Sequence, residues 1–319
     1  MPSLRPSRPR RSVSRPRIVV VGDLVVDVVL APDRALEHGT DVTGHVRLVQ
    51  GGSAATTARW IGRLGARSSM IAAVGRDPAG RALVETLHAD HVTARVVRVP
   101  GARTGRIGVF VNPDGERSFV TDRAAALQLR ASDIRASWFA RADAVHLPVY
   151  SLLDEPLSSA GRRAIEHGRT AGAAVSIDLA SIGPLLARGR RAARSLLDEL
   201  APDLLFATAS EAEALLGRYA VEGLLEVAPV AVIKRGSKGA TVMAIEADGH
   251  LRFEVATEHI NATDTTGAGD AFDAGFLVAW FTARASGKSL PTSLRRATLA
   301  GHRAAARQLT SPRSELPLA

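Results

Sequence analysis

The chain has 319 residues, enough for one large α/β domain or two ordinary ones, and 46% of them are hydrophobic, which is ample for a core. It contains no cysteine, which excludes a disulfide framework, thiolate metal sites and cysteine nucleophiles. The formal net charge is +9, so a nucleic-acid partner has to be considered. No apolar run approaches the roughly 20 residues needed to span a bilayer, and no secretory leader is recognisable before Ile18, so we expect a cytoplasmic protein.

Most of the positive charge lies in the first 17 residues. This segment holds six arginines and no acidic residue, which leaves three of the nine net positive charges for the remaining 302 residues. It also holds four prolines and has little apolar surface to bury, so we expect residues 1–17 to form a disordered tail. Because the rest of the chain is nearly balanced in charge, we favour a solvated extension over a nucleic-acid arm.

After the tail, β-rich apolar segments alternate with amphipathic ones, which is typical of a parallel sheet covered by helices. The expected strands are Ile18–Val21, Ser69–Val74, Ala144–Leu147, Val175–Asp178, Leu204–Ala207 and Val230–Lys234. The expected helices are Ala54–Leu64, Gly80–Ala89, Leu157–Ala171, Arg190–Leu200, Glu211–Leu216, Ala268–Ala283 and Leu294–Gln308. Such sheets bind ligands beyond the carboxyl ends of their strands, which places Asp23, Asp77 and Asp178 at the functional edge.

One stretch breaks this alternation. Val92–Val99, Gly105–Val111 and Ser118–Thr121 are three short strand patterns separated by turn signals. We expect them to form a small β-element that leaves the main sheet, either as a lid over a substrate or as a decorative hairpin. A lid would exclude water that could otherwise accept a phosphoryl group.

Residues 264–270 read Asp-Thr-Thr-Gly-Ala-Gly-Asp and run directly into an apolar helix-like segment. Small residues at a helix N-terminus leave backbone N–H groups free to bind an anion. Asp270 would repel a bound phosphate, so its presence there suggests a general base for an attacking hydroxyl. An ordinary aspartate at a helix start explains the segment equally well when it is taken alone.

A second glycine pair precedes another expected helix. Gly51 and Gly52 would let a ligand approach the backbone closely, and upstream Asp27 could accept hydrogen bonds from two adjacent hydroxyls, as in sugar binding. Each feature is also explained by a simple turn. No GxxxxGK[ST] loop, no GxGxxG after the first strand and no HRDxxxxN signature occurs, so the 267–269 segment is the strongest phosphate site in the sequence.

The order of these features resembles the PfkB/ribokinase family of carbohydrate kinases. The matching segments are Gly22 with Asp27, Gly51–Ala55, Gly75–Gly80, the small β-element, Lys234–Gly239, and Asp264–Asp270 followed by Ala271, Phe272 and Gly275. The resemblance implies a three-layer α/β/α kinase domain over residues 18–312, with a mostly parallel central sheet. It also implies a small β lid from segments at about 31–50 and 92–121, and a C-terminal tail over residues 313–319.

The resemblance assigns the catalytic and acceptor roles. Asp270 matches the family's catalytic base, and Gly267, Ala268 and Gly269 match its anion hole. Asp27, Gly51 and Gly52 match positions that bind substrate hydroxyls. Thr56 lies in the same substrate segment, where the family often has asparagine. Threonine keeps an oxygen but loses the paired donor and acceptor of the amide, so the sugar contacts at this position should differ.

The resemblance also assigns the cofactors, ATP and Mg²⁺, and in many members K⁺. Lys234, Gly236, Ser237 and Gly239 match the turn along the nucleotide, and His302 matches a position that borders the adenine. Glu211 matches a residue that acts on magnesium through water. Thr208 stands where that motif often has asparagine, which weakens the magnesium assignment. Asp264 and Thr266 match part of a monovalent-cation site.

The acceptor is less determined by the sequence. Members that phosphorylate 2-keto-3-deoxy acids commonly carry an asparagine and an arginine that residues 178–183 lack, which favours a neutral sugar. We expect the phosphorylated group to be a primary hydroxyl. The lid arginines Arg103, Arg106 and Arg117 could still meet an anion, and Phe110 and Phe119 could stack on a nucleobase. A nucleoside kinase of adenosine or pseudouridine type, a sugar-acid kinase and a non-catalytic sugar- or nucleotide-sensing protein remain alternatives. Many relatives dimerise through their lids, so we expect a homodimer.

Overall fold

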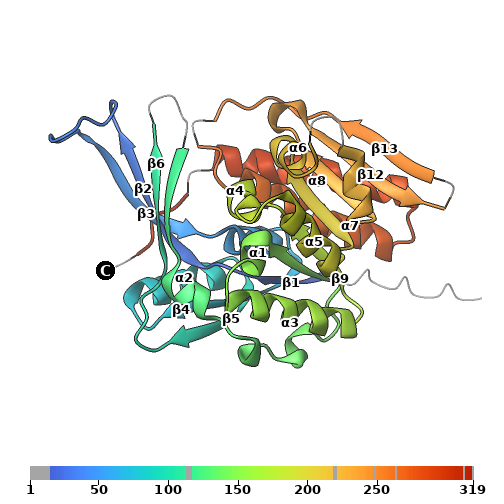
Figure 1. Cartoon of the computed structure of the whole chain (residues 1–319), viewed down its shortest axis with the longest axis horizontal. Coiled ribbons are helices and arrows are strands. Elements are labelled where there is room, and N and C mark those ends of the chain that lie inside the picture. The colour runs from blue at the N-terminus through green and yellow to red at the C-terminus, as the bar shows by residue number, and fades with distance from the viewer. Residues whose placement is uncertain are drawn as a thin grey trace, which may run out of the picture.

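A nine-stranded sheet runs through the body of the molecule (Figure 1). The computed structural model describes residues 15–112, 117–217, 221–247, 249–262, 264–311 and 313–317. In sheet order the strands are β13 (Gly249–Val255), β12 (Ala240–Glu246), β11 (Val230–Lys234), β10 (Leu204–Thr208), β9 (Ala174–Asp178), β8 (Ala144–Pro148), β1 (Arg17–Val21), β4 (Arg67–Gly75) and β5 (Val92–Val99). All neighbours from β11 to β5 are parallel, and the pairs β11–β12 and β12–β13 are antiparallel.

Helices cover both faces of this sheet, as its mostly apolar and buried inner strands require. One face packs against α1 (Ser53–Arg63), α2 (Pro78–Ala89), α7 (Ala268–Ala285) and α8 (Leu290–Thr310). The other face packs against α3 (Leu157–Thr170), α4 (Ile182–Leu186), α5 (Arg190–Leu200) and α6 (Ala209–Leu216). These three layers confirm the expected fold class, and the predicted strands and helices are present with ends that shift by a few residues.

A separate four-stranded sheet stands out from the body (Figure 1), and we call it the lid because it holds most of the segments predicted to form one. Its strands, in sheet order, are β3 (Gly44–Gly51), β2 (Val25–Pro32), β6 (Arg106–Val111) and β7 (Arg117–Asp122). Because side chains alternate between the two faces of a strand, the register places Asp27, Val109 and Phe119 on one face. Val46 and Val120 lie on the opposite face. The lid therefore presents Asp27 at its base and an exposed aromatic ring further out on the same side.

The structure differs from the sequence prediction in three places. Val92–Val99 does not belong to the lid; it pairs in parallel with β4 as the edge strand of the main sheet. Asp77 is not positioned as a ligand: its carboxylate accepts the N–H groups of Gly80 and Thr104, so it caps α2 and fixes the chain after β5. The antiparallel pair β12 and β13 was not expected, because it follows the point where strands and helices cease to alternate.

The two ends of the predicted kinase domain also differ from expectation. Arg17 belongs to β1, and residues 1–14 of the predicted tail lie outside the described residues. The segment after α8 is not a free tail where it is described. Glu315 forms a bridge with Val49 of β3, the Leu316 N–H donates to the Leu48 carbonyl at 2.8 Å, and the Leu316 side chain is buried. This segment therefore extends the lid sheet beyond β3.

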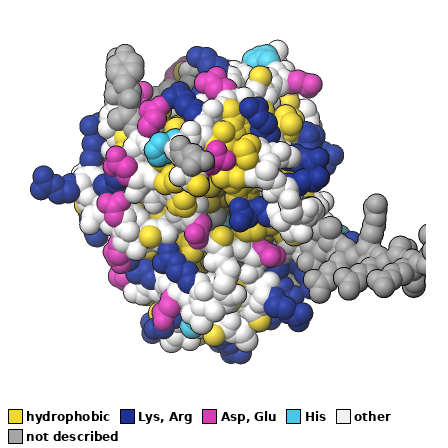
Figure 2. Space-filling view, turned by 90° about the vertical axis from the view of Figure 1, so that its right-hand side faces the viewer, with side chains coloured by type: hydrophobic (Ala, Val, Ile, Leu, Met, Phe, Trp, Pro, Cys, Tyr) yellow, Lys and Arg dark blue, Asp and Glu magenta, His cyan; other side chains and the backbone are white. Residues whose placement is uncertain are grey.

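Figure 2 shows one face of the body, seen from the right-hand side of Figure 1. Apolar side chains gather near its middle, and Lys and Arg alternate around them with Asp and Glu. This mixture of signs agrees with the small net charge of the chain outside its first 17 residues. None of the described helices is both long and apolar enough to cross a membrane.

Candidate active site

The start of α7 has the geometry of an anion site. Gly267 is the N-cap residue, with φ of 78°, a left-handed conformation that glycine adopts without strain. A Cβ atom at this position would lie 3.0 Å from the Thr56 side chain, so the site is also crowded. The first amides of an 18-residue helix have no partner within the helix and lie at the positive end of its dipole. Ala268 and Gly269 supply two of these amides, and the Ala268 N–H donates to the Thr265 carbonyl just before the helix at 3.3 Å.

Asp270 lies in the first turn of α7 and faces the start of α1. Its Oδ1 atom accepts a hydrogen bond from the Ser53 hydroxyl at 2.5 Å, and Thr57 approaches its carbonyl oxygen at 3.4 Å. Burial raises the pKa of Asp270 to about 7; the Ser53 bond opposes this rise and the charge of Asp178 adds to it. A carboxylate with a pKa near neutrality can accept a proton from a hydroxyl and later release it.

A buried lysine lies behind this junction. Lys234 ends β11, and its Nζ atom is 3.1 Å from Asp178 at the end of β9 and 3.1 Å from Asp273, one turn after Asp270. The side chains of Asp178 and Asp273 are 5% and 0% exposed. Burial alone would lower the pKa of Lys234, but the surrounding carboxylates raise it well above its ordinary value. The lysine is therefore a fixed positive charge in a group of carboxylates.

Lys234 also lies next to the anion site. A Cβ atom built on Gly269 would lie 3.3 Å from Nζ, a tight contact, so glycine gives the ammonium group room at this position. The predicted nucleotide-binding lysine and the predicted anion hole thus meet in one place. Buried charge in such a group would be costly without the pairing, which explains why the lysine and the aspartates occur together.

The predicted acceptor residues lie where β2 and β3 enter the body. Asp27 is 6% exposed, and burial raises its pKa while the nearby arginine Arg313 lowers it. A Cβ atom on Gly51 would lie 1.9 Å from Asp27 Oδ1, and one on Gly52 would lie 2.3 Å from the Asp23 carbonyl oxygen. Gly52 has φ of 94° and is the N-cap of α1. Gly51 therefore makes room for Asp27 of β2, and Gly52 is required by its positive φ and by the Asp23 carbonyl just before β2.

Two arginines occupy the predicted monovalent-cation residues. Arg313, from the segment after α8, contacts Asp27 Oδ2 at 2.8 Å and Asp264 Oδ2 at 3.3 Å. Arg117 of β7 contacts Asp264 Oδ1 at 3.2 Å and donates to the hydroxyl of Thr266. Asp264 and Thr266 are brought together as predicted, but their oxygens already have cationic partners. The residues present therefore do not fit a bound K⁺.

The predicted nucleotide residues fall into two groups. Gly236 and Ser237 form an exposed 3₁₀ turn after β11, and Gly239 closes it with φ of 85°. A Cβ atom on Gly239 would lie 2.1 Å from the Val255 carbonyl oxygen, so this position also requires glycine. His302 lies on α8 with its ring 5.3 Å from that of Phe272, and burial lowers its pKa. Among the described residues, no hydrogen bond links His302 to the turn.

Glu211, the predicted magnesium residue, is held at the start of α6. Its Oε2 atom accepts the Thr208 N–H at 2.7 Å, and the Thr208 hydroxyl accepts the Glu211 N–H at 3.2 Å, which is a capping box. Burial raises the pKa of Glu211, and the charge of Asp178 raises it further. Glu211 and Asp178 lie close enough for their charges to interact, and Asp178 also pairs with Lys234; two such carboxylates fit a role in binding Mg²⁺ through water.

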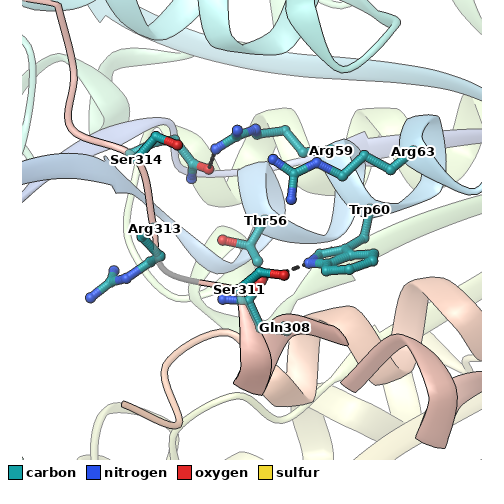
Figure 3. A pocket seen from close by; sticks show the side chains of 9 residues that line it. Thr56, Arg59, Trp60, Arg63, Gln308, Ser311, Arg313 and Ser314 are labelled. Carbon is teal, nitrogen blue, oxygen red and sulfur yellow. Dashed lines mark hydrogen bonds between the residues drawn. The ribbon is translucent and has the colours of Figure 1, made fainter. Parts of the chain in front are cut away.

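Figure 3 shows a small cavity of about 60 Å³ beside the acceptor end of the site. It lies between α1, α8 and the segment after α8, and it is lined by Gln50, Thr56, Arg59, Trp60, Arg63, Gln308, Ser311, Arg313 and Ser314. Two hydrogen bonds cross it, from Arg59 to Gln50 at 2.6 Å and from Trp60 to Gln308 at 2.8 Å. Ligand pockets are usually about 300 Å³ or larger, so this cavity suits water rather than a sugar.

Sequence reasoning missed several of these side chains. Ser53 and Asp273 lie within the matching motifs but carried no signal of their own, because their partners are distant in the sequence. Arg313 was placed in a tail. The pairing of Thr208 with Glu211 could have been predicted, since Thr-x-x-Glu before an apolar run is a capping-box pattern.

Comparison with known proteins identifies the family. A model of the "pfkB family carbohydrate kinase" matches residues 15–316, nearly the whole chain. The chain belongs to the PfkB family of carbohydrate kinases. It is 30% identical to a probable fructokinase-4 of Arabidopsis thaliana over 278 residues, which cover 82% of this chain and 81% of the relative. It is 27% identical to a mouse ribokinase over 273 residues, with 84% and 82% covered.

A solved PfkB-family structure supports the fold. A double mutant of Vibrio cholerae fructokinase, crystallised with fructose, ADP and potassium ion, superposes with a TM-score of 0.78 at 26% identity. The match covers 97% of this chain and 96% of that chain. Membership in the family makes the protein a phosphotransferase with an alcohol group as acceptor. The anion site at the start of α7 and the residues around it are where this chemistry has to be sought.

Proposed function

We propose that this PfkB-family protein transfers the γ-phosphoryl group of ATP to a primary hydroxyl of a small neutral sugar. The observation that carries the proposal is Asp270, which lies in the first turn of α7 beside the anion site and has a pKa of about 7. Its bond to Ser53 fixes one carboxylate oxygen, Oδ1, and leaves Oδ2 to approach an acceptor hydroxyl. In this role Asp270 takes the hydroxyl proton as the oxygen attacks phosphorus.

The amides at Gly267–Gly269 and the Lys234 ammonium supply positive potential where the transferring group gains charge. Donors that are already oriented need no reorganisation during the reaction, and removing one comparable donor typically costs about 10² to 10³ in rate. Lys234 is held by Asp178 and Asp273, so its position does not depend on ligand. These groups would act by holding the phosphoryl group in place and by stabilising the charge that it gains.

A neutral acceptor is supported by the pairing of the nearby arginines. Arg117 contacts Asp264, and Arg313 contacts both Asp27 and Asp264. Arg123, just after the lid, contacts Asp23 at 2.7 Å. Each guanidinium thus has a carboxylate partner, which leaves none of these three to hold the carboxylate of a sugar acid. Asp27 Oδ1 and the close backbone at Gly51 remain to bind sugar hydroxyls.

We propose that the phosphates of the nucleotide lie along the Gly236–Gly239 turn and that the adenine lies beside His302, whose ring packs on the buried Phe272. Glu211 and Asp178 would hold Mg²⁺ through water, and the ion would neutralise phosphate charge when bound. The charge of Asp178 raises the pKa of Glu211, and a bound cation would offset this repulsion, which supports this pair over isolated surface acids.

A nucleoside acceptor is the second candidate, and Phe119 favours it. This ring is 55% exposed and lies on the same lid face as Asp27, so it could stack on a base while Asp27 holds the ribose. The fructokinase and ribokinase relatives favour a sugar instead, because they match over most of their length.

We also propose a homodimer formed through the lid and a cytoplasmic location. The lid exposes Val46 and Val120 on the face opposite Asp27, and both are more than 60% exposed. Exposed apolar side chains on a small sheet are commonly covered by a partner.

Activity measurements on Asp270→Asn test the proposed reaction. The amide cannot accept the proton, so kcat should fall by about 10² to 10⁴ while the variant stays folded and still binds ATP. Ser53→Ala should lower kcat less, because the base remains. Asp198→Asn, a half-exposed carboxylate on α5, is the matched control and should leave turnover unchanged. Unaltered turnover in Asp270→Asn would remove the base assignment.

The acceptor is identified with ATP and a panel of ribose, fructose, 2-keto-3-deoxygluconate, adenosine and pseudouridine. Turnover of ribose or fructose with the highest kcat/KM supports the proposal. A preference for adenosine or pseudouridine selects the nucleoside kinase, and a preference for the sugar acid contradicts the argument from paired arginines. No turnover of any acceptor, together with retained ATP binding, would favour a sensing protein.

A further inference from the structure

The loop that leads into α7 is surrounded by nitrogen donors. Asp264 Oδ1 receives Arg117 at 3.2 Å and the Thr266 N–H at 2.9 Å, and Asp264 Oδ2 receives Arg313 at 3.3 Å. Arg117 also donates to the hydroxyls of Thr265 and Thr266. The remaining Thr266 acceptor, its carbonyl oxygen, receives Gln308 Nε2 at 2.9 Å. The oxygens that would coordinate a cation thus accept hydrogen bonds from side chains of this chain.

The two arginines are suited to replace an ion. Their side chains are 18% and 14% exposed, and guanidinium groups stay protonated at every physiological pH. Together with Asp264 and Asp27 they form a group with two positive and two negative charges. A potassium ion placed at Asp264 would meet two fixed positive charges at close range, in a partly buried region where screening is weak.

We propose that Arg117 and Arg313 are built-in cations that hold the 264–267 loop, so that this enzyme needs no monovalent ion. The inference rests on the proposed kinase function and concerns the regulation of that same site. Thr266 directly precedes Gly267, the N-cap of α7, so fixing Thr266 fixes the amides of the anion site. Arg117 comes from the lid and Arg313 from the segment after α8, which ties both elements to the loop.

A different role for these arginines would be to hold an anionic acceptor. Both guanidinium groups are already paired with carboxylates at 2.8–3.3 Å, and an acceptor anion would have to displace Asp27 or Asp264. The structure therefore favours the replacement of an ion over the binding of a sugar acid.

The first test uses the wild-type protein exchanged into choline chloride. Adding KCl at constant ionic strength should change kcat/KM by no more than about twofold, the size of a residual salt effect. The melting temperature should be the same in KCl as in choline chloride, which is a readout independent of turnover. Strong activation by KCl, or a specific rise in melting temperature, overturns the proposal. If no acceptor is turned over, the proposed function fails, and the melting curves still decide whether the ion binds.

The second test removes the built-in charges. Arg117→Ala and Arg313→Ala should each lower kcat by about tenfold or more in choline, as loss of an orienting contact does, and KCl should restore part of that loss. Arg313→Lys, which keeps the charge, should retain more turnover than Arg313→Ala. Arg252→Ala, which removes an exposed arginine of β13, is the control and should be unaffected.

Three results would overturn the inference. The first is unchanged turnover in Arg117→Ala, which lies on an exposed lid strand and should fold even if Arg313→Ala does not. The second is a loss in both alanine variants that KCl does not restore at any concentration. The third is a wild-type preference for 2-keto-3-deoxygluconate that Arg313→Ala abolishes, because the arginine would then be a substrate ligand.

Discussion

Asp270 and Lys234 illustrate how single residues depend on their surroundings in this site. Both are charged groups in a region from which water is largely excluded. The charge of Lys234 lowers the pKa of Asp270, and Asp270 is one of the carboxylates that raise the pKa of Lys234. Burial pushes Asp270 toward its neutral form, and Lys234 opposes that effect. The balance leaves a base whose pKa lies near the pH at which it has to work.

The pKa of Asp270 predicts the pH dependence of the enzyme. A base has to be ionised before the reaction, so kcat/KM should rise with pH and reach half its plateau near pH 7. The measurement is kcat/KM between pH 5.5 and 9 in buffers of equal ionic strength. A profile already flat at pH 5.5 would show that no group with this pKa controls the reaction.

Replacing Lys234 should move that profile. Lys234 lowers the pKa of Asp270, so Lys234→Met should shift the acidic limb to higher pH and lower kcat by about tenfold or more. The double variant Lys234→Met/Asp273→Asn removes one charge of each sign and should shift the limb less than the single variant does. A limb at the same pH in the single variant would contradict the electrostatic role.

The same pKa predicts a pH-dependent effect of Asp270→Asn on stability. The pKa of Asp270 is raised on folding from an ordinary 3.8 to about 7. Its ionisation therefore costs the folded state stability progressively between these two values, and the whole cost is present above pH 7. Asp270→Asn removes this cost, so it should raise the melting temperature at pH 8 and have little effect near pH 4. Thermal unfolding at both pH values measures the difference, and an equal effect at both would contradict it.

At the scale of elements, the turn between β3 and α1 sets the distance between the lid and the body. Gly52 has φ of 94° and faces the Asp23 carbonyl oxygen, so a side chain would meet both strain and collision. Gly52→Ala should therefore destabilise the fold by about 2 kcal/mol or more. Gly65→Ala is the control, because Gly65 has φ of 80° but a Cβ atom there would meet no atom within 4 Å. This variant therefore introduces backbone strain without a collision. Its cost should be about 1 kcal/mol, and urea unfolding of both variants tests the difference.

Some elements could be predicted from sequence and others could not, for physical reasons. Strands such as Val230–Lys234 are apolar on both faces because helices cover both sides of the sheet, and this pattern is visible in the sequence. Val92–Val99 carries the alternating pattern of a half-exposed strand, which fits an edge of the main sheet as well as a lid. Only the pairing with β4 distinguishes the two.

In the candidate site, too, some features could be predicted from the sequence and others could not. The motif at residues 264–270 predicted the start of α7 and the place of Asp270, because both depend on neighbours in the sequence. The contacts of Ser53 with Asp270 and of Arg313 with Asp27 join residues 217 and 286 positions apart. No local pattern encodes such pairs, so they became visible only in the folded chain.

At the scale of the whole molecule, the lid predicts a dimer. Val46 and Val120 share one exposed face of the lid sheet. The wild-type protein should elute as a dimer in size-exclusion chromatography with light scattering. Val46→Glu/Val120→Glu should elute as a monomer, because burying two carboxylates in an apolar contact is costly. Leu299→Glu, at a 45% exposed position of α8, is the control and should stay dimeric. A monomeric wild type would contradict the proposal.

The contact of Arg313 with Asp27 has a consequence for synthesis of the protein. Asp27 leaves the ribosome early, and its partner is added 286 residues later. The phosphate side of the site can assemble from α1 and α7 before then, but the acceptor end and the loop at Asp264 still lack one of their charges. A translation product that stops short of residue 313 would therefore carry every motif of a kinase and an incomplete acceptor end. Such a product should phosphorylate the acceptor about tenfold or more slowly than the full chain, as expected for Arg313→Ala.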